Sequence, residues 1–365
     1  AAQALVGNYI KQYPLPKKQL NGKEIEVPLE HTPLYVNELQ PFQERVYTLL
    51  IKKTRREMTK GKVDFEDLNK FGFRMLQTPL EALTMVYPSP DLDTYLENPV
   101  EDNEIPNLGE MNVGKRGLYN IMNFVDETNK PVPLKHSYSY KPDVLEKYGP
   151  IFREDILSNY SAKFSFIIKS IRKSKGIIMI YTQYIDGGAL PMALALEEMG
   201  FARFGTSSNS QSLFERPPSD PLDVFTMKSR RELTDKNKFK QAKYVLITGD
   251  KAFSQQNTKD LKEIVRPENK NGELIKVVII SRAGSEGLDF KNIRQIHIVD
   301  PWYNTNRSEQ IIGRGVRNLS HCMLPFDERN VEIYMHATYL PKSNDWETAD
   351  VYVYRLAKNK AIKIG

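Results

Sequence analysis

Three polar side chains in the stretch NTNRSEQIIGRGVRN, residues 304–318, share one face if the stretch is a helix. Gln310, Arg314 and Arg317 fall at positions i, i+4 and i+7, so they would point at one target. A guanidinium presents a planar fork of donors, which suits a target with paired oxygen atoms. Two arginines on an amphipathic helix are more often an ordinary solvated face, and the rest of the chain must decide between these interpretations.

Two glycines interrupt the same stretch. Inside a helix, Gly313 and Gly315 each cost on the order of 1 kcal/mol relative to alanine. Positions at which a sequence gives up stability are often functional. We therefore expect another group to approach the helix closely at this point.

A second candidate is SRAGSEGLDF, residues 281–290, which directly follows the strand-like run IKVVII. Ligands of α/β domains bind at the loops that follow the carboxyl ends of parallel strands. Gly284 and Gly287 allow the backbone to approach a phosphate, and amide groups beside Ser285 can form a small anion nest. This loop and the 304–318 helix together are a stronger signal than either is alone.

Short apolar runs alternate with helix candidates from about residue 176 onward, which predicts an α/β domain with a parallel sheet buried on both faces. The expected strands are GIIMIYTQ, KYVLITG, IKVVIIS, RQIHIVD and VEIYMHATY. Helices are expected in LPMALALEEMG, TKDLKEIVR and NRSEQIIGRGVR, and a C-terminal helix in WETADVYVYRLAKNKAIKI.

The chain before residue 150 is less regular. The segment FQERVYTLLIKKTRREM is expected to be helical. Residues 91–110 carry seven acidic residues and no Lys or Arg, and they are expected to form an exposed loop or insertion. SSNSQSLFERPPSDPLD, residues 207–223, is interpreted as a second loop-rich insertion between the first and second strands.

The segment GEMNVGKRGLYNIMNFVDE, residues 109–127, imitates a phosphate loop. Gly109, Gly114 and Lys115 fit the pattern, but Arg116 stands where the pattern requires a Ser or Thr to hold magnesium. No buried strand is expected before Gly109, and the spacing from Gly114 to Asp126 is expected to leave no room for a helix and a strand. We therefore expect no phosphate loop in this chain.

Composition restricts the class of protein. The 365 residues suffice for about two domains, and the net charge of +6 with basic clusters at 52–62 and 228–243 fits a polyanionic partner. A solvated surface explains any single cluster as well. No apolar run predicts a membrane span, and the single cysteine, Cys322, excludes an internal disulfide. We expect a reducing, cytoplasmic location without secretion, and the opening AAQALVGNYI suggests a fragment of a longer protein.

These motifs together resemble the second motor lobe of superfamily 2 helicases and translocases. SRAGSEGLDF is similar to motif V of that family, QIIGRGVR to motif VI, DPWYN to the segment before motif VI, and IIMIYTQ to motif IV; LITGD resembles a nucleic-acid-contacting loop of the lobe. The resemblance is to helicases of large DNA viruses, such as the African swine fever virus helicase related to the poxvirus early transcription factor small subunit. Its strong part covers residues 150–362, whereas the insertions at 91–140 and 203–240 resemble no segment of that family.

The resemblance implies an architecture. Residues 141–365 would form a helicase C-terminal lobe, which is a RecA-like parallel sheet flanked by helices and followed by a C-terminal helix. Residues 1–140 would form a preceding, mainly helical inter-lobe region with an acidic insertion.

The resemblance also implies roles for single residues. Arg314 and Arg317 would be arginine fingers for the γ-phosphate of ATP, and Gln310 would couple the nucleotide to the cleft. The cofactors would be ATP and Mg²⁺, held mainly by a first lobe that this chain lacks, so the chain alone is expected to be inactive. Positions near the nucleotide would be Gly287, Asp289 and Gly313, and contacts to the nucleic-acid backbone would come from Thr182, Gln183, Thr248, Gly249, Ser281, Arg282 and Ser285.

Other conspicuous residues are expected to be structural. His297 lies within an expected strand and is interpreted as packed rather than catalytic, and Trp302 suits packing as well as nucleotide stacking. The stripe Leu194, Leu196 and Met199 is expected to belong to the core. Five histidines and one cysteine predict no metal site.

The resulting hypothesis is an ATP-driven nucleic-acid motor. Its partner would be nucleic acid, DNA rather than RNA, with viral transcription machinery as a further partner in a viral factory or virion, and no membrane. One alternative is a double-strand translocase or a transcription-initiation ATPase that does not unwind. The other is a non-enzymatic nucleic-acid-binding or docking module.

Overall fold

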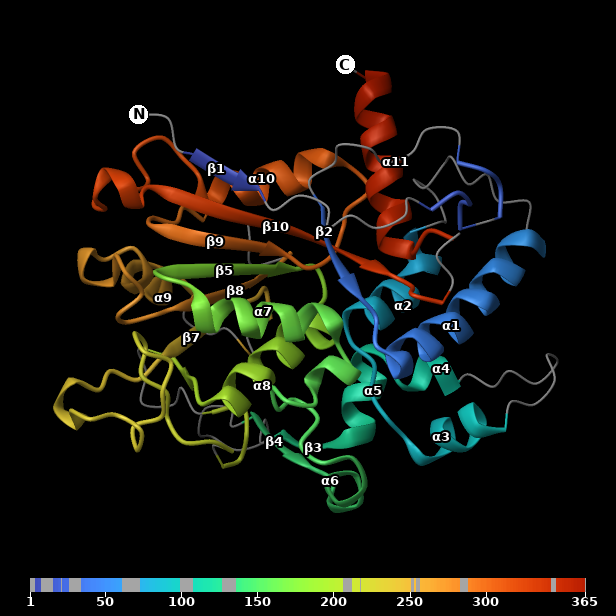
Figure 1. Cartoon of the computed structure of the whole chain (residues 1–365), viewed down its shortest axis with the longest axis horizontal. Coiled ribbons are helices and arrows are strands. Elements are labelled where there is room, and N and C mark those ends of the chain that lie inside the picture. The colour runs from blue at the N-terminus through green and yellow to red at the C-terminus, as the bar shows by residue number, and fades with distance from the viewer. Residues whose placement is uncertain are drawn as a thin grey trace.

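One parallel sheet organises the chain (Figure 1). The computed structural model describes residues 4–7, 16–20, 22–25, 34–60, 73–98, 108–126, 136–205, 212–216, 218–250, 253, 257–282, 288–342 and 346–364. Among these residues, eight strands pair in the order β1-β10-β9-β5-β8-β7-β6, and β2 also pairs with β10. Every pairing in this sheet is parallel, so the predicted parallel sheet is confirmed.

The central strands coincide with the five apolar runs of the sequence. Side chains alternate between two cores: Ile178 and Ile180 pack on one face of the sheet, whereas Ile177 and Met179 pack on the other. Burial on both faces explains why the runs contain almost no polar residue. The strands are β5 (Ile177–Thr182), β7 (Lys243–Ile247), β8 (Val277–Ser281), β9 (Ile293–Ile298) and β10 (Asn330–Tyr339), with the two-residue β6 (Ala202–Arg203) at one edge.

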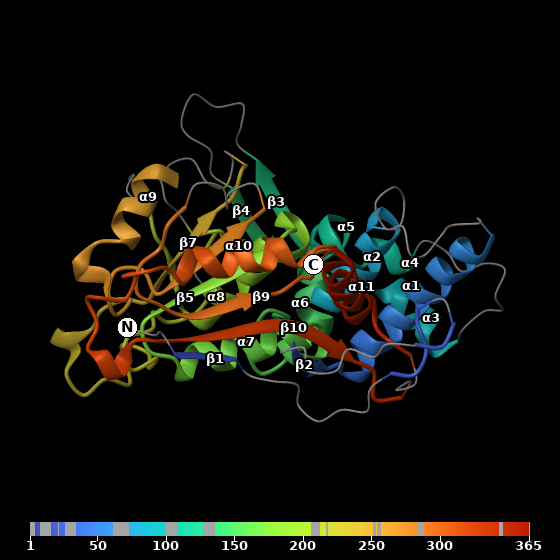
Figure 2. The ribbon, with the colours of Figure 1, turned by 90° about the horizontal axis from the view of Figure 1, so that it is seen from above.

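Helices cover both faces of the sheet. Helices α7 and α8 contribute to one core, and α9 and α10 contribute to the other. Figure 2 shows α7 and α10 on opposite sides of the strands. The predicted core stripe of Leu194, Leu196 and Met199 is buried on α8. The four helices are α7 (Ala162–Lys173), α8 (Leu190–Met199), α9 (Asn257–Ile264) and α10 (Thr305–Gly315), and the last three coincide with helices predicted from the sequence.

Two strands from the N-terminal region enter this sheet. β1 (Ala4–Gly7) pairs with the first part of β10, and β2 (Leu34–Glu38) pairs with its last part. The expectation of a mainly helical region over residues 1–140 omits both strands. Asn37 and His336, which contact each other across the β2–β10 pair, are 299 positions apart, so no local sequence pattern predicts the pairing. The boundary at residue 140 therefore does not coincide with the limit of the sheet.

The other described elements of the N-terminal region are mostly helical, as expected, and the predicted helix at residues 42–58 is present. A separate two-stranded antiparallel sheet joins β3 and β4. The elements are α1 (Pro41–Lys60), α2 (Phe73–Thr84), α3 (Pro90–Glu97), α4 (Leu108–Met111), α5 (Gly114–Ile121), β3 (Met122–Asp126), β4 (His136–Tyr140) and α6 (Pro142–Tyr148).

Helix α3 corrects the expectation of an exposed loop over residues 91–110. Ser89 caps the first turn by accepting a hydrogen bond from the amide of Leu92, and Pro90 occupies the first helical position. Leu92 and Leu96 are buried in the main core. The acidic residues that suggested a loop include Asp91, which lies in the first turn, where negative charge stabilises the helix dipole.

The segment that imitates a phosphate loop also differs from expectation. Helix α5 begins at Gly114 and strand β3 contains Asp126, so a helix and a strand do fit between these residues and that argument was wrong. Gly109, however, lies in the short helix α4, and β3 pairs with β4 outside the parallel sheet. A phosphate loop joins a buried strand of the main sheet to a helix, and this segment does not have that arrangement.

Helix α11 (Ala349–Ile364) confirms the predicted C-terminal helix. It packs on β2 and β10, where Val351 and Tyr354 meet the strand residues. A buried ion pair fixes its first turn: Lys163 Nζ of α7 lies 3.0 Å from Asp350 Oδ2. Lys163 also donates to the carbonyl of Val299, at 2.9 Å, so the three elements α7, α11 and the end of β9 are held together.

Two histidines in neighbouring strands form a buried chain of hydrogen bonds. Asn37 Nδ2 lies 3.1 Å from His336 Nδ1, His336 Nε2 lies 3.0 Å from His297 Nδ1, and His297 Nε2 lies 3.3 Å from Gln295 Oε1. Because Nδ2 of Asn37 can only donate, each imidazole accepts at one nitrogen and donates at the other, so both imidazoles are neutral. Burial lowers the pKa of His297 to about 3 and that of His336 well below its usual value. The prediction that His297 is a packed residue is consistent with this environment.

The lowered histidine pKa values predict acid sensitivity. The folded state binds protons at His297 only near pH 3, whereas the unfolded chain binds them near pH 6.5, so stability is complete above about pH 6.5 and is lost as pH falls toward 3. By pH 5 the loss from His297 amounts to about 2 kcal/mol. Unfolding by urea at pH 7 and pH 5 measures it in wild type and in His297→Gln. We expect the difference in free energy of unfolding between wild type and His297→Gln to shrink toward pH 5. Carboxylates titrate alike in both proteins, so their contribution cancels in this difference. An unchanged difference would show that His297 is not neutral in the fold.

Candidate nucleotide and nucleic-acid interface

The carboxyl ends of β5 and β9 meet at the buried side chain of Asp300. Its carboxylate accepts hydrogen bonds from the hydroxyl of Thr182 at 2.5 Å, the amide of Gln183 at 2.9 Å and the hydroxyl of Thr84 at 2.9 Å. Burial raises the pKa of Asp300, and the nearby charge of Lys163 together with these donors opposes the rise. The carboxylate thus joins two strands of the sheet to helix α2.

This junction lies between two neighbouring strands whose following helices cover opposite faces of the sheet. β5 is followed by α8 on one face of the sheet, and the neighbouring β9 is followed by α10 on the other face. Such a switch point leaves a crevice outside the carboxyl ends of the strands, where ligands of α/β folds bind. Here Thr84 of α2 contacts Asp300, which follows β9. We call this edge of the sheet, at the carboxyl ends of β5 and β9, the carboxyl edge.

Helix α10 runs from the carboxyl edge back toward the beginning of β9, where Gly315 packs on Ile293. Asn304 caps the helix by accepting a hydrogen bond from the amide of Arg307 at 3.2 Å. The helix ends at Gly315, so Arg317 lies beyond its last turn and the expected i+7 face does not exist. Gln310 is exposed on the helix and Arg314 is partly exposed. The backbone turn after Gly315, rather than helical spacing, brings Arg317 near Arg314.

The two glycines of this helix behave differently. A Cβ on Gly315 would lie 3.0 Å from Cδ1 of Ile296 in β9 and 3.4 Å from Ile293, so the expected close approach exists here. A Cβ on Gly313 would have no described atom within 4 Å. Close packing of the helix on β9 thus favours glycine at position 315, whereas no described contact explains Gly313.

Both arginines contact the strand-following segment that the sequence analysis singled out. Arg314 Nη1 donates to the carbonyl of Leu288 at 3.1 Å, and its own carbonyl accepts from the amide of Phe290 at 3.0 Å. Arg317 Nη1 lies 2.8 Å from Asp289 Oδ1. The two predicted motifs are therefore physically joined. Gly284, Ser285 and Gly287 of the same loop lie outside the described residues.

A further arginine, in the first turn of α10, was missed by the sequence analysis. Arg307 Nε donates to the hydroxyl of Tyr181 at 3.3 Å, and Arg307 Nη2 donates to the carbonyl of Arg282 at 3.3 Å. Arg282 and Arg307 both lie over the ring of Trp302, at 4.7 and 5.7 Å from its centroid. Arg307 precedes Gln310 by three positions and Arg314 by seven, and this spacing would have identified it.

The residues predicted to contact a nucleic-acid backbone divide into two groups. The side chains of Thr182, Thr248 and Ser281 are buried, so their hydroxyls offer no surface to a phosphate and that expectation needs correction. Thr182 instead bonds Asp300, and Thr248 accepts a hydrogen bond from the Asp250 amide at 3.3 Å. Gly249 and Arg282 are exposed and Gln183 is partly exposed, so these three remain available.

A cavity of about 650 Å³ adjoins Gln183 on the α2 side of the carboxyl edge. Lys115 and Arg116 line it, but three carboxylates line it too, and one of these, Glu110, pairs with Lys53 at 2.7 Å. Burial raises the pKa values of the other two, Glu81 and Asp186; a hydrogen bond from Gln77 opposes the rise at Glu81, and the charge of Lys115 opposes it at Asp186. The mixed charge means that the cavity does not attract phosphate by charge alone. Its lining comprises Gln77, Thr78, Glu81, Glu110, Val113, Lys115, Arg116, Gln183, Tyr184, Ile185, Asp186 and Gly187.

Two other properties of the described residues bear on cofactors and location. No cluster of three or more His, Cys, Asp or Glu side chains among them is arranged to hold a metal ion. In the same part of the chain, no helix is both long enough and apolar enough to cross a bilayer.

Known proteins similar to this chain include viral proteins named as helicases and as a termination factor homolog. Residues 216–318 match the family model described as the helicase conserved C-terminal domain, which contains β7, β8, β9, α10 and both predicted arginine fingers. A termination factor NPH-I homolog of African swine fever virus (isolate Tick/Malawi/Lil 20-1/1983) is 29% identical over 189 residues, covering 50% of this chain and 27% of that protein. A putative ATP-dependent RNA helicase of Acanthamoeba polyphaga mimivirus, R350, is 40% identical over 263 residues, covering 68% of this chain and 28% of that protein.

The solved structure of the C-terminal part of the Fun30 ATPase domain aligns with a TM-score of 0.37 and 12% identity, covering 95% of this chain and 100% of that one. The chain spans about a quarter of the length of the curated viral relatives described above. The predicted relation to helicases of large DNA viruses is confirmed by the family match and these relatives.

The Asp300 junction generates a stability prediction. Thr84→Val removes one hydrogen bond to a buried carboxylate and should lower the free energy of unfolding by about 1–2 kcal/mol. Asp300→Ala leaves three buried donors without their acceptor and should cost about 3 kcal/mol or more. Urea denaturation measures both, with the exposed Asp327→Ala as a control that should change stability by less than about 0.5 kcal/mol. If Asp300→Ala is no more harmful than Thr84→Val, the carboxylate is not the common acceptor.

Proposed function

We propose that this chain, in which residues 216–318 are a helicase conserved C-terminal domain related to those of large-DNA-virus helicases, is one lobe of an ATP-dependent nucleic-acid helicase or translocase. The observation that carries the proposal is the junction of Arg314 and Arg317 with residues 288–290, which joins the two stretches that resemble helicase motifs. Guanidinium groups lie there beside the segment that follows β8 and leads into β9. In the intact motor the two arginines donate to the γ-phosphate of ATP bound by another lobe.

The contacts that hold these arginines are weak enough to be exchanged for a phosphate. The side chains of Arg317 and Asp289 are 49% and 60% exposed. An ion pair with this much exposure to water contributes only about 0–1 kcal/mol to stability. Arg314 bonds the neutral carbonyl of Leu288, and no carboxylate among the described residues pairs with it. Arg317 Nε also donates to the neutral carbonyl of Gly313 at 2.9 Å. Charge-assisted, bidentate bonds to a phosphate are stronger than these contacts. Asp289 thus holds Arg317 in place until nucleotide binds.

The phosphates and metal of the cofactor require groups beyond those described here. The arginines fit phosphate oxygens, but the described residues offer no carboxylate cluster suited to Mg²⁺. We assign the nucleotide cradle and the metal to another lobe of a longer motor, so that this chain alone does not turn over ATP. When bound, ATP with Mg²⁺ supplies the phosphoryl group whose transfer drives the cycle. The arginines of this chain neutralise charge that develops during that transfer.

Nucleic acid is proposed to cross the carboxyl edge of the sheet. Gln183 Nε2 bonds the carbonyl of Pro301, and the amide of Gln183 bonds Asp300, so a strand held by Gln183 contacts the junction directly. Gly249 and Arg282 are exposed at the ends of neighbouring strands. Such donors grip phosphates without reading bases, which suits a motor that moves along any sequence. The preference for DNA over RNA stays a prediction, since the mimivirus relative is named an RNA helicase.

A motor that acts in transcription without unwinding is a second candidate. It is favoured by the name of the African swine fever virus relative, a termination factor homolog. Both candidates use the same arginines and differ only in whether a duplex is separated. A strand-displacement assay beside an ATPase assay distinguishes them.

The arginine fingers can be tested in the longer protein that contains this chain. Lysine keeps the charge of Arg314 or Arg317 but loses the planar fork, so Arg314→Lys and Arg317→Lys should each lower ATP turnover roughly 10³-fold. ATP affinity in the ground state should change much less, because the fingers act on charge that develops in the transition state. Steady-state ATPase, nucleotide binding and thermal unfolding measure these effects. Arg266→Lys, an exposed arginine outside the carboxyl edge, serves as the matched control. Near-normal turnover in both variants would show that the arginines are ordinary solvated surface residues.

Binding of nucleic acid by this chain should depend on salt rather than on sequence. Contacts to phosphates release counterions, so affinity for unrelated oligonucleotides should fall steeply and similarly between ~50 and ~200 mM salt. Fluorescence anisotropy with several oligonucleotides of equal length measures both properties. A strong preference for one sequence would support the binding-module hypothesis, in which side chains read base edges.

A further inference from the structure

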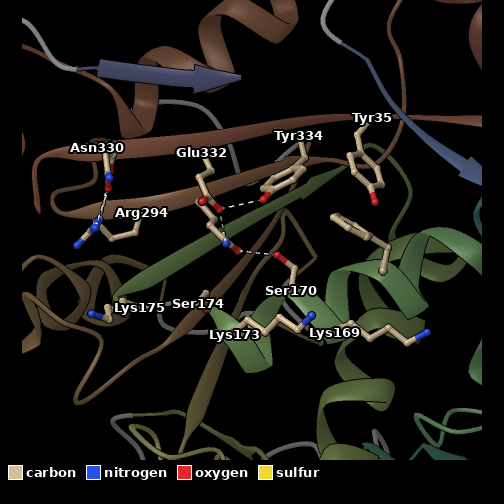
Figure 3. A pocket seen from close by; sticks show the side chains of 12 residues that line it. Tyr35, Lys169, Ser170, Lys173, Ser174, Lys175, Arg294, Asn330, Glu332 and Tyr334 are labelled. Carbon is tan, nitrogen blue, oxygen red and sulfur yellow. Dashed lines mark hydrogen bonds between the residues drawn. The ribbon is translucent and has the colours of Figure 1, made fainter. Parts of the chain in front are cut away.

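A cavity of about 760 Å³ opens at the opposite end of the sheet from the carboxyl edge (Figure 3). It lies between the last turns of α7 and the beginnings of β9 and β10. Figure 3 shows Arg294, Asn330, Glu332 and Tyr334 on the strand side, with Lys169 and Lys173 on the helix facing them. We call it the lysine pocket, and its lining comprises Tyr35, Phe166, Lys169, Ser170, Lys173, Ser174, Lys175, Arg294, Gln295, Asn330, Glu332 and Tyr334.

The charge of the lysine pocket is strongly positive. Lys169, Lys173 and Lys175 are exposed and make no ion pair with any described residue. Lys169 and Lys173 are one helical turn apart, and Lys175 follows the helix, so the three lysines line one side of the opening. Lys173 also stabilises the negative end of the α7 dipole, but that role does not account for Lys169 or Lys175.

The only carboxylate of the lining belongs to Glu332, and it is engaged within the wall. Glu332 Oε2 accepts hydrogen bonds from Gln295 Nε2 at 2.7 Å and from the Tyr334 hydroxyl at 2.9 Å. The side-chain oxygen of Gln295 accepts a hydrogen bond from the hydroxyl of Ser170 in α7 at 3.1 Å. Arg294 is held by the Asn330 side chain at 2.7 Å. The wall is thus fixed, while the lysines carry unpaired charge toward the opening.

Aromatic rings form one end of the pocket. Tyr35 of β2 stacks on Phe166 of α7, with centroids 3.9 Å apart and an angle of 27° between the rings, and Tyr334 lies 5.4 Å from Phe166. Tyr35 is only partly buried, so part of its ring surface faces the opening. Flat aromatic surfaces beside unpaired lysines are the combination that binds single-stranded nucleic acid, because bases stack while phosphates meet the charge.

We propose that the lysine pocket binds a single strand of nucleic acid, distant from the carboxyl edge. Backbone phosphates of the strand contact Lys169, Lys173 and Lys175, and a base lies against Tyr35. This inference rests on the proposed function, since it gives the motor a second contact with the strand that it moves along. An acidic protein segment would use the lysines but would gain little from the aromatic end, so the strand is the better occupant.

The test compares two triple variants of this chain. K169Q/K173Q/K175Q removes the pocket lysines, and K259Q/K262Q/K270Q removes three exposed lysines of α9 and the following turn with the same change in net charge. Anisotropy with a labelled 20-nucleotide oligothymidylate is measured across salt concentrations. Each lost phosphate contact on a single strand reduces the log–log salt slope by about 0.7, so the pocket variant should lose about 2 units of slope and bind on the order of 100-fold more weakly at ~0.1 M salt. The control variant should bind like wild type.

Each outcome has one meaning. Circular dichroism and thermal unfolding verify that the pocket variant is folded, and Lys175→Gln alone, outside the helix, should lose about a third of the slope change. Equal loss in both triple variants, or none in the pocket variant, overturns the pocket site and leaves the proposed function standing. Failure of wild type to bind any oligonucleotide overturns both. If poly-L-glutamate displaces the oligonucleotide from wild type as well as an unlabelled strand of equal charge does, the pocket is a site for acidic protein and the inference is wrong. ATP displacing the strand at equal phosphate concentration would make it a nucleotide site, with the same consequence.

Discussion

The buried carboxylate of Asp300 constrains the whole carboxyl edge. A charge removed from water is costly unless donors surround it, and this one is surrounded by Thr84, Thr182 and the amide of Gln183. These donors come from α2 and from the end of β5, so neither element can move away without leaving the carboxylate exposed to an apolar interior. The position of α2, and with it the helical N-terminal region, is therefore tied to the sheet at the point where ligands of such folds bind. Thr182 serves this junction, which explains why a residue expected to grip a phosphate is buried.

The arginines near the beginning of β9 have the opposite character. Asp300 is bound by three short contacts in the interior, whereas Arg317 is bound by an exposed ion pair and the carbonyl of Gly313, and Arg314 by the carbonyl of Leu288. The first arrangement costs several kcal/mol to break and the second about 1 kcal/mol or less, so only the second can change during a reaction cycle. Easily released cations carried on a rigid sheet are what a site needs when it must bind, neutralise and release a phosphate. Gly315, packed against Ile296, keeps the helix that carries Arg314 close to β9.

The parts of the structure that the sequence predicts are those with a local cause. Strands β5, β7, β8, β9 and β10 are buried on both faces and leave unbroken apolar runs, and α10 carries a polar face that ends at a glycine. Strands β1 and β2 escape prediction because their partner β10 is distant in the chain, and a five-residue strand has too few residues to display a pattern. Helix α3 escapes because its acidic residues indicate solvent, although two leucines one turn apart are buried. The position of Arg317 depends on where α10 ends, and helix ends are set by backbone contacts such as that of Gly315 that composition does not reveal.

The two ends of the sheet are connected by its own polar interior. From Asn37 the hydrogen-bonded chain passes through His336, His297 and Gln295 and reaches Glu332 at the wall of the lysine pocket. This order is possible only while both imidazoles are neutral, because a second proton on either would leave two donors facing each other. The same burial that keeps them neutral fixes the register of β2 against β10, since Asn37 must meet His336. Tyr35 lies opposite His336 in that register, so the chain also determines where the aromatic end of the pocket stands. The position of the Tyr35 ring therefore depends on the neutral state of the two buried imidazoles.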